Sequence, residues 1–156
     1  MITKRTDTVN LCPINYQAIS SKYKIPLAVC IGLDNKEYTL ETILETKEFI
    51  YAYPSREQLK QVLYCGTVLG RDVDKLANTD FEFAESEDVS HPNLVGAAVN
   101  LECKVVHSYN TDDFTILIGE ILKMNSSDKN SLDKIYTLLG MRYGVKKEVD
   151  VVQEIR

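Results

Sequence analysis

The chain has 156 residues, of which 44% are hydrophobic and 26% are charged, as is typical of a soluble globular protein and not of a disordered chain. This length suits one domain with a sizeable core, so we expect residues 1–156 to form a single domain. The formal net charge is -5 and no basic cluster is longer than Lys146–Lys147, which disfavours nucleic-acid binding but leaves a small anion possible.

Membrane and metal sites are also disfavoured. No apolar run approaches the roughly 20 residues that span a bilayer, and Met1–Asp7 lacks the apolar stretch of a signal peptide, so we expect no membrane association and a cytoplasmic protein. The four cysteines lie far apart in the sequence, without the close pairs of a zinc site. Cys103 and His107 could share a strand face, but two ligands do not make a metal site. We predict reduced thiols and no metal.

Most of the predicted elements are strands. The first is the apolar run Ile25–Leu33, which is bounded by turn residues and predicts a strand buried on both faces. Similar β-rich character marks Phe49–Tyr53, Leu101–Val106 and Phe114–Leu122. We therefore expect a mainly β fold with short helices.

The strand predicted around Leu101 has an alternating pattern. Apolar Leu101, Cys103 and Val105 alternate with polar Asn100, Glu102 and Lys104. Because successive side chains of a strand point to opposite faces, we expect one buried face and one wetter face.

Two short helices carry start signals. Thr39 precedes an apolar stripe that begins at Leu40, and its hydroxyl can cap the first turn. Ser55 with Gln58 three residues later resembles a capping box ahead of Leu59.

The later part of the chain is less regular. Asp80–Asn93 is acidic and lacks a sustained period, which favours an exposed loop, with a lid over a ligand as the alternative. Leu132–Leu139 has a short helical pattern, and Gly140 and Gly144 are expected to mark turns. Glu148–Ile155 could be a last strand or an arm that contacts a partner subunit.

The most informative segment for function is Tyr64–Lys75. Gly66 and Gly70 let the backbone approach a flat or phosphorylated ligand closely. Arg71 and Lys75 supply cations that lie on one side if a helix begins there. A helix end followed by a tight turn and a solvated helix start would explain the same residues.

A second segment, Ile31–Thr39, predicts a strand end followed by a helix start. Free N–H groups at the start of a helix, the Thr39 hydroxyl and Lys36 would form a phosphate cradle. Asp34 and Glu37 oppose an anion there, and an ordinary capped helix is an equally good interpretation.

A third segment, Val9–Ser21, offers neutral Asn and Ser side chains of the kind that an isoalloxazine edge or a ribityl chain needs. Turn residues would look the same. The sequence contains no Ser/His/Asp set, paired-acid motif or Walker loop, so a cofactor would carry any chemistry.

Taken together and in this order, the segments resemble the flavin reductase-like family of FMN-binding split barrels, which includes flavoredoxins and ferric reductases. The resemblance runs from about Asn10 to about Tyr143. It is carried by Asn10–Pro13, Ser20–Leu27, Tyr38–Glu41, Cys65–Lys75, Asn100–Cys103 and Ile118–Ile121. It implies a small β-barrel, usually a homodimer, with FMN near the subunit interface and reduced by NAD(P)H or another donor.

The resemblance also implies roles for individual residues. Asn10, Ser20 and Ser21 would face the flavin ring or ribityl chain, and Lys36 and Thr39 would hold the phosphate. The Gly66–Lys75 loop would close over the cofactor. The implied cofactor-binding residues are Asn10, Ser20, Ser21, Lys36, Thr39, Cys65, Gly66, Gly70, Arg71 and Lys75. We expect Cys65 to be a packed thiol.

Two positions depart from the family pattern. Nine residues precede Asn10 where the family generally has another strand, so we expect a shortened N-terminal strand or one completed by a partner. Glu37 stands where the family commonly has Arg, which would weaken phosphate binding.

We favour an FMN-dependent oxidoreductase that passes electrons from NAD(P)H or another donor through flavin to an acceptor. A non-catalytic flavin-binding or interaction module on the same scaffold is the alternative. A barrel that binds no flavin is a third possibility, because fold does not fix function.

Overall fold

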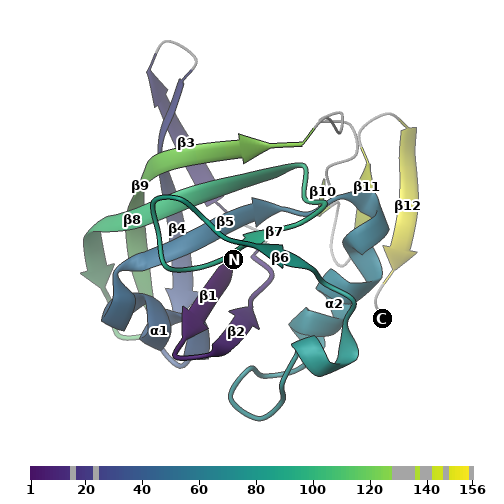
Figure 1. The fold of residues 1–156 in the computed structure, drawn as a ribbon, viewed down its shortest axis with the longest axis horizontal. Helices are drawn as coiled ribbons and strands as arrows, with labels where there is room; N and C mark the ends of the chain where they lie inside the picture. The colour runs from purple at the N-terminus through teal and green to yellow at the C-terminus, as the bar shows by residue number, and fades with distance from the viewer. Residues whose placement is uncertain (15–16, 23–24, 128–135, 138–141, 146–147, 155–156) are drawn as a thin grey trace.

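The structure is a computed structural model that describes residues 1–14, 17–22, 25–127, 136–137, 142–145 and 148–154. Seven strands form one antiparallel sheet in the order β2-β1-β5-β8-β9-β4-β3, which curls into an open barrel (Figure 1). These strands are β1 (Ile2–Arg5), β2 (Thr8–Leu11), β3 (Gln17–Lys22), β4 (Ile25–Asp34), β5 (Glu48–Tyr53), β8 (Val99–Asn110) and β9 (Phe114–Ser126). The expectation of a mainly β fold with short helices is confirmed.

The helices are short. The two α-helices are α1 (Tyr38–Thr46) and α2 (Leu59–Thr67), and the two 3-10 turns are η1 (Arg56–Gln58) and η2 (Leu76–Asn78). None of the helices in the described ranges has the length and apolar character needed to cross a bilayer.

Two smaller sheets complete the fold. One pairs β6 (Phe83–Ala84) with β7 (Asn93–Leu94), and the other has the order β10-β11-β12, formed by Tyr136–Thr137, Arg142–Val145 and Glu148–Glu154. The sequence left a last strand or a partner-binding arm open for Glu148–Ile155, and the strand is confirmed over Glu148–Glu154 as β12.

Two predictions near the C-terminus were wrong where they can be compared with the structure. Tyr136 lies in β10 instead of a helix, and the rest of the predicted helix falls outside the described residues, apart from Thr137 in the same strand. Gly144 lies in β11 at a register irregularity and not in a turn. Gly140 is outside the described residues.

The N-terminal residues do supply a strand ahead of Asn10. Four residues form β1, which pairs with β2 through Ile2 and Leu11 and with β5 through Ile2 and Ile50. The strand is short, as expected, but it is part of the sheet without help from a partner.

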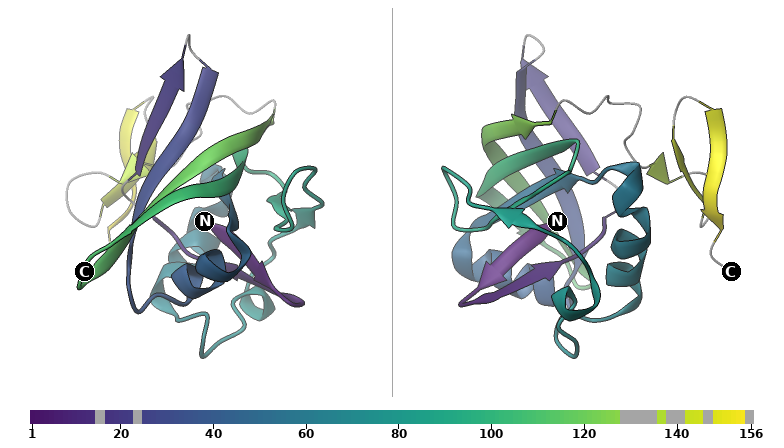
Figure 2. Two further views of the ribbon diagram at one scale, coloured as in Figure 1. Left: turned by 90° about the vertical axis from the view of Figure 1, so that its left-hand side faces the viewer. Right: turned by 45° about the vertical axis from the view of Figure 1, so that its right-hand side comes forward.

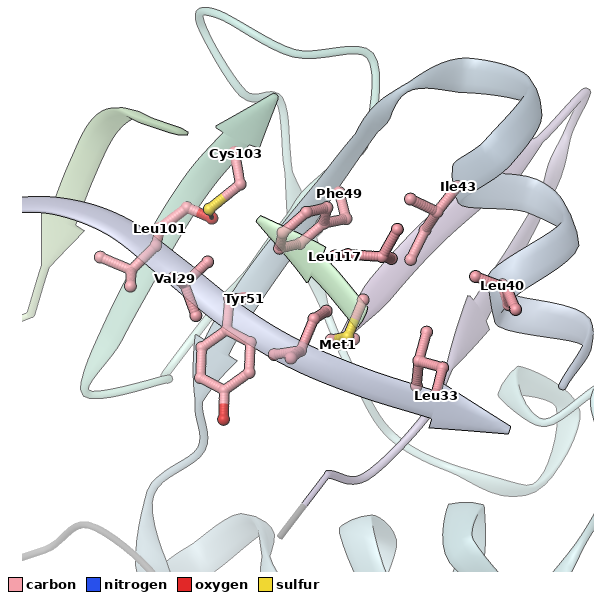
Figure 3. Packing of buried hydrophobic residues seen from close by; sticks show 11 residues of the cluster. Met1, Val29, Leu33, Leu40, Ile43, Phe49, Tyr51, Leu101, Cys103 and Leu117 are labelled. Atoms are coloured by element: carbon pink, nitrogen blue, oxygen red, sulfur yellow. Dashed lines mark hydrogen bonds between the residues drawn. The ribbon is translucent and has the colours of Figure 1, made fainter. Parts of the chain in front are cut away.

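β4 is buried on one face, so the prediction of two buried faces was wrong. Val29, Ile31 and Leu33 point into the main core, whereas Gly32 and Asp34 on the other face are exposed. The main core combines this face of β4 with residues of α1, β5, β8 and β9 (Figure 3). The outward positions of β4 are small or polar, and they are partly buried at Ala28 and Cys30 and exposed at Gly32 and Asp34.

The strands covered on both faces are β5 and part of β8. Phe49 and Tyr51 of β5 face the main core, while Ile50 packs on the opposite side with Cys65 of α2 and Leu94 of β7. This second core explains why a short strand in the middle of the sheet is apolar at successive positions.

On β8 the expected wetter face is buried. Leu101 and Cys103 face the main core as predicted, but Asn100 and Glu102 are also buried, at 6% and 0% exposure. Residues 80–93, which we call the acidic excursion, cover this second face. The burial of Asn100 and Glu102 was missed because the alternating pattern within β8 contains no information about the segment that covers this face.

The two helix starts differ in outcome. The capping box is confirmed, with the Ser55 N–H donating to Gln58 Oε1 at 3.0 Å, although a 3-10 turn precedes α2. The Thr39 cap was wrong, because the N-cap of α1 is Glu37 without a side-chain cap bond and Thr39 lies inside the first turn.

The acidic excursion was expected to be an exposed loop, and this too needs correction. Val89, His91 and Asn93 are buried, and the backbone N–H groups of Glu87 and Asp88 donate to the Glu102 carboxylate at 3.1 and 2.7 Å. The excursion is therefore anchored to the sheet by hydrogen bonds at several points.

His91 is one of these anchors. The Lys4 N–H donates to its Nδ1 at 2.9 Å, and its Nε2 lies 2.9 Å from the Glu48 carbonyl oxygen. Nδ1 must be unprotonated to accept, so Nε2 carries the hydrogen. Burial lowers the pKa of His91, in agreement with a neutral ring.

Glu102 is the central anchor. Its carboxylate also accepts from Asn93 Nδ2 at 3.0 Å and Asn125 Nδ2 at 2.7 Å. Burial by itself would raise the pKa of Glu102, but the side-chain and backbone donors outweigh it and the pKa is lowered. The buried group is therefore a carboxylate surrounded by donors.

Replacing Glu102 with Gln should lower the free energy of unfolding by about 1–3 kcal/mol at neutral pH, because a neutral amide directs N–H groups at donors. Urea unfolding measures the change. Glu120→Gln, at an exposed position of β9, is the control and should change stability by less than about 0.5 kcal/mol.

The same pair of proteins tests the charge state. Because the folded pKa lies below the unfolded value of 4.5, the stabilisation by Glu102 is present above that pH and disappears as the pH falls toward the folded pKa. The difference between wild type and Glu102→Gln should therefore shrink on acidification. A difference that stays constant down to acid pH would contradict a buried carboxylate.

Candidate functional site

Three segments that are distant in sequence meet at the start of α1. Asn10 at the end of β2 donates from Nδ2 to Thr39 Oγ1 at 2.8 Å, and both side chains are buried. A Cβ atom on Gly70 would lie 2.0 Å from Asn10 Oδ1. Asn10 therefore connects β2, α1 and the loop 68–75, and Gly70 is needed there because a side chain has no space.

The carbonyl end of Asn10 has no conventional donor. Within the described part of the chain, Asn10 Oδ1 is buried without a hydrogen-bond partner. Its near neighbour is Gly70, whose backbone C–H offers only a weak contact. An unpaired buried acceptor is uncommon, and here it accompanies the close approach of two backbone segments.

Arg71 lies on the exposed side of this junction. Its guanidinium forms an ion pair with Glu41 in the first turn of α1, and its Cζ lies 5.8 Å from the ring centroid of Tyr38. Sequence reasoning identified Arg71 but missed both neighbours as its partners. Both partners belong to Tyr38–Glu41, which carried part of the family resemblance, but they are 30 or more residues from Arg71 and no local pattern indicates the contact.

Lys75 is not beside Arg71. No helix begins at Arg71, and the next helical residues belong to η2. The Lys75 side chain is 6% exposed, and its Nζ donates to the Leu11 and Cys65 carbonyl oxygens at 2.8 and 2.7 Å. Its ammonium therefore connects β2 to α2 inside the molecule.

Cys65 and Gly66 belong to α2. Cys65 is buried, and burial raises the pKa of its thiol, which disfavours the reactive thiolate. Gly66 is helical and exposed, with its Cβ position 3.6 Å from Pro13 Cγ. α2 ends at Thr67, one residue after Gly66.

Lys36 lies in the turn between β4 and α1. Its side chain is exposed, and its backbone N–H donates to Asp34 Oδ1 at 2.8 Å. Glu37 follows as the N-cap of α1. One cation, Lys36, therefore lies between two carboxylates, Asp34 and Glu37, just before α1.

Ser20 and Ser21 lie apart from this group. They are exposed on β3, opposite Ala28 and Pro26 of β4. The six steps from Ala28 to Asp34 extend about 20 Å along a strand, and Figure 2 shows the β3–β4 hairpin projecting beyond the body of the sheet. The candidate residues thus form one group at the start of α1 and a second on the hairpin.

The chemistry available to both groups is binding by hydrogen bonds and charge. No cluster of His, Cys, Asp and Glu suited to a metal ion occurs among the described residues. The junction also brings together no nucleophile with a base, so any redox chemistry would come from a bound cofactor.

Comparisons with known proteins agree with this geometry. The family model described as "Flavin reductase like domain" matches residues 2–145. An uncharacterized protein of Archaeoglobus fulgidus is 34% identical over 103 residues, which cover 66% of this chain and 58% of that protein. This chain aligns with between 55% and 63% of the length of three curated relatives.

Solved structures show the same fold at lower identity. The flavoredoxin from Methanosarcina acetivorans has a TM-score of 0.82 at 24% identity, over 94% of this chain and 82% of its own. An FMN-binding domain of a flavin reductase-like enzyme from Shewanella baltica has a TM-score of 0.76 at 18% identity, over 94% and 84%. The barrel fold is therefore shared with these proteins.

The contact between Gly70 and Asn10 can be tested by adding one methyl group. Gly70→Ala should lower the free energy of unfolding by about 1–3 kcal/mol, because the Cβ cannot coexist with Asn10 Oδ1. Thermal or urea unfolding measures this change. Gly32→Ala is the matched control, since a Cβ there meets nothing within 4 Å; equal stability of the two variants would contradict the close approach.

Proposed function

Because the chain belongs to the flavin reductase-like domain family, whose model covers residues 2–145, we propose that it is an FMN-dependent oxidoreductase. The observation that supports this most directly is the junction of Asn10, Thr39, Gly70 and Arg71 at the start of α1. Separate segments that resemble the family motifs are packed together there, as a shared ligand site requires.

The start of α1 fits the phosphate end of FMN. α1 has nine residues, and although the N–H groups of Leu40 and Glu41 donate to the Glu37 carbonyl oxygen, those of Tyr38 and Thr39 lie at the positive end of the helix, where an anion can accept from them. Lys36 and Arg71 are exposed and add positive charge beside it. We assign the phosphate to these groups, and we assign Lys75 to support of the loop because its ammonium is held by two carbonyl groups.

The hairpin fits the polar edge of the ring or the ribityl chain. Ser20 and Ser21 present exposed hydroxyl groups that can donate and accept. Their separation along β4 from the start of α1 matches an extended ligand with an anionic end and a neutral polar end. Asn10 holds the segments between these ends in place through Thr39.

The chemistry would come from the cofactor. Bound flavin supplies hydride and electron transfer between NAD(P)H or another donor and an acceptor. The residues of this chain would bind the phosphate, orient the ring and keep the loop 68–75 closed against Asn10. We place this activity in a single cytoplasmic domain.

We also propose a homodimer. Ile19 and Leu27 are 42% and 45% exposed, although they lie on the same face of the hairpin as buried Val29. A second copy would cover this apolar surface next to Ser20 and Ser21, close to the ring end of the proposed site.

A non-catalytic flavin-binding or interaction module is the second candidate. Asp34, Glu37 and Glu41 place three carboxylates around the two cations at the start of α1. Like charge weakens phosphate binding, so a low affinity for FMN would favour this alternative.

The purified full chain should show the absorption bands of oxidised flavin after FMN is added and free ligand is removed. Lys36→Glu should weaken FMN binding by about 1–3 kcal/mol, because a charge-assisted contact is replaced by repulsion. Fluorescence titration with FMN measures the dissociation constant.

Lys60→Glu makes the same charge change at an exposed position of α2 and should leave the affinity nearly unchanged. Equal effects of the two variants would remove Lys36 from the site. Flavin binding with steady NAD(P)H oxidation supports the oxidoreductase, whereas binding without turnover with any donor supports the module. A colourless protein that ignores FMN would overturn both.

Light scattering coupled to size exclusion tests the dimer. We expect twice the chain mass for the wild type and a shift toward one chain for Leu27→Glu, because a buried unpaired carboxylate is costly at an apolar interface. Lys104→Glu, at an exposed position of β8, is the control. A monomeric wild-type protein would contradict the proposal.

A further inference from the structure

A second concave site lies beside the acidic excursion. A cavity of about 310 Å³ opens between the β6–β7 pair and the end of β9, a volume at the lower end for small-molecule sites. Its walls contain no residue of α1, of the loop 68–75 or of the β3–β4 hairpin. It is therefore separate from the proposed flavin site.

The buried Glu102 fixes the orientation of two amides in the cavity wall. Asn93 and Asn125 both direct Nδ2 at the Glu102 Oε1 atom, at 3.0 and 2.7 Å. A carboxylate only accepts hydrogen bonds, so each amide must turn its NH2 end toward Glu102, where one N–H is used, and keep its carbonyl oxygen for another partner.

The third amide in the wall is already satisfied. Asn100 accepts the Leu94 N–H at its Oδ1 and donates from Nδ2 to the Leu94 carbonyl, both at 3.0 Å. The carbonyl oxygens of Asn93 and Asn125 are therefore the acceptors that remain for a ligand, beside one further N–H group on each amide.

One of these acceptors is unsatisfied. Asn93 is 8% exposed, and its Oδ1 is buried with no hydrogen-bond partner in the described ranges. Leaving such an atom unpaired costs free energy, which a ligand donor would recover after a small movement of the side chain.

The charge and the apolar lining narrow the ligand class. Glu85 and Glu87 are exposed carboxylates at the cavity, and Glu87 also pairs with Lys123. Carboxylates on one side of a concave site attract cations and repel phosphate. Leu94 and Val95 in the wall offer apolar contact for a short aliphatic stem.

We infer that this cavity binds a small organic cation, with a primary ammonium or guanidinium group on a short aliphatic stem. The cation supplies the N–H donor that Asn93 Oδ1 lacks, and it offers a positive partner to Glu85, since Glu87 already pairs with Lys123. A guanidinium group suits the site best, because its several N–H groups can reach more than one acceptor at once.

Agmatine, which carries both groups, is the probe. Calorimetric titration of the full chain should show saturable binding, and agmatine should raise the melting temperature. Sodium butyrate and 1-butanol, which have similar stems without the cation, should do neither. Glu85→Gln should weaken agmatine binding about two- to five-fold, as expected for loss of one exposed charge contact.

Two tryptophan variants locate the binding. Ser126→Trp places a large side chain at the cavity and should abolish the agmatine response, while Ser108→Trp on the exposed part of β8 should retain it. No saturable agmatine binding by the wild type, equal binding of butyrate, or an unchanged response in Ser126→Trp would overturn the inference. Because these readouts need no flavin, they are independent of the proposed oxidoreductase activity.

Discussion

The second face of the sheet depends on one buried carboxylate. Glu102 is fully buried, and an ionised group in that position is tolerated only when donors surround it. Asn93, Asn125 and the backbone N–H groups of Glu87 and Asp88 provide those donors. A polar, acidic segment is thereby held against β8 without a large apolar face of its own.

That attachment creates the second core. Val89, Leu94 and Ala97 pack with Ile50 of β5 and Cys65 of α2, so the central strand β5 is covered from both sides. α2 is in turn joined to β2 through Lys75. The loop that carries Gly70 and Arg71 lies between two fixed points, which explains how a segment without regular structure can keep close contact with Asn10.

The sequence was sufficient for four strands of the main sheet, the two α-helices and the resemblance to a family, because these are carried by local patterns. The strands at β4, β5, β8 and β9 and the capping box at Ser55 follow from periodicity and short-range hydrogen bonds. Local patterns could not predict the hydrogen-bond partners of the buried charged side chains, because those partners are distant in the sequence. Lys75 finds its carbonyl partner 64 residues away at Leu11, and Glu102 finds an amide 23 residues away at Asn125.

The same limit explains the errors about exposure. A polar residue that alternates with apolar ones is expected to face water, and Asn100 and Glu102 follow this pattern. They are buried because Leu94 of β7 satisfies Asn100, and partners from the acidic excursion and β9 satisfy Glu102. Arg71 and Lys75 belong to the same motif, yet Arg71 is exposed and Lys75 is buried. The sequence did not distinguish between these two cations.

The carboxylates of Glu41 and Glu37 at the start of α1 differ in how strongly they would oppose the binding of an anion. The Arg71–Glu41 pair is exposed on both sides, and exposed ion pairs contribute little, about 0–1 kcal/mol, so a phosphate can share Arg71 without a large loss. Glu37 differs because its backbone is fixed as the N-cap. Its carboxylate stays within one residue of the helix start, where an anion would bind. If the proposed FMN site lies here, the balance between Lys36 and Glu37, more than Arg71, would set its affinity for the phosphate.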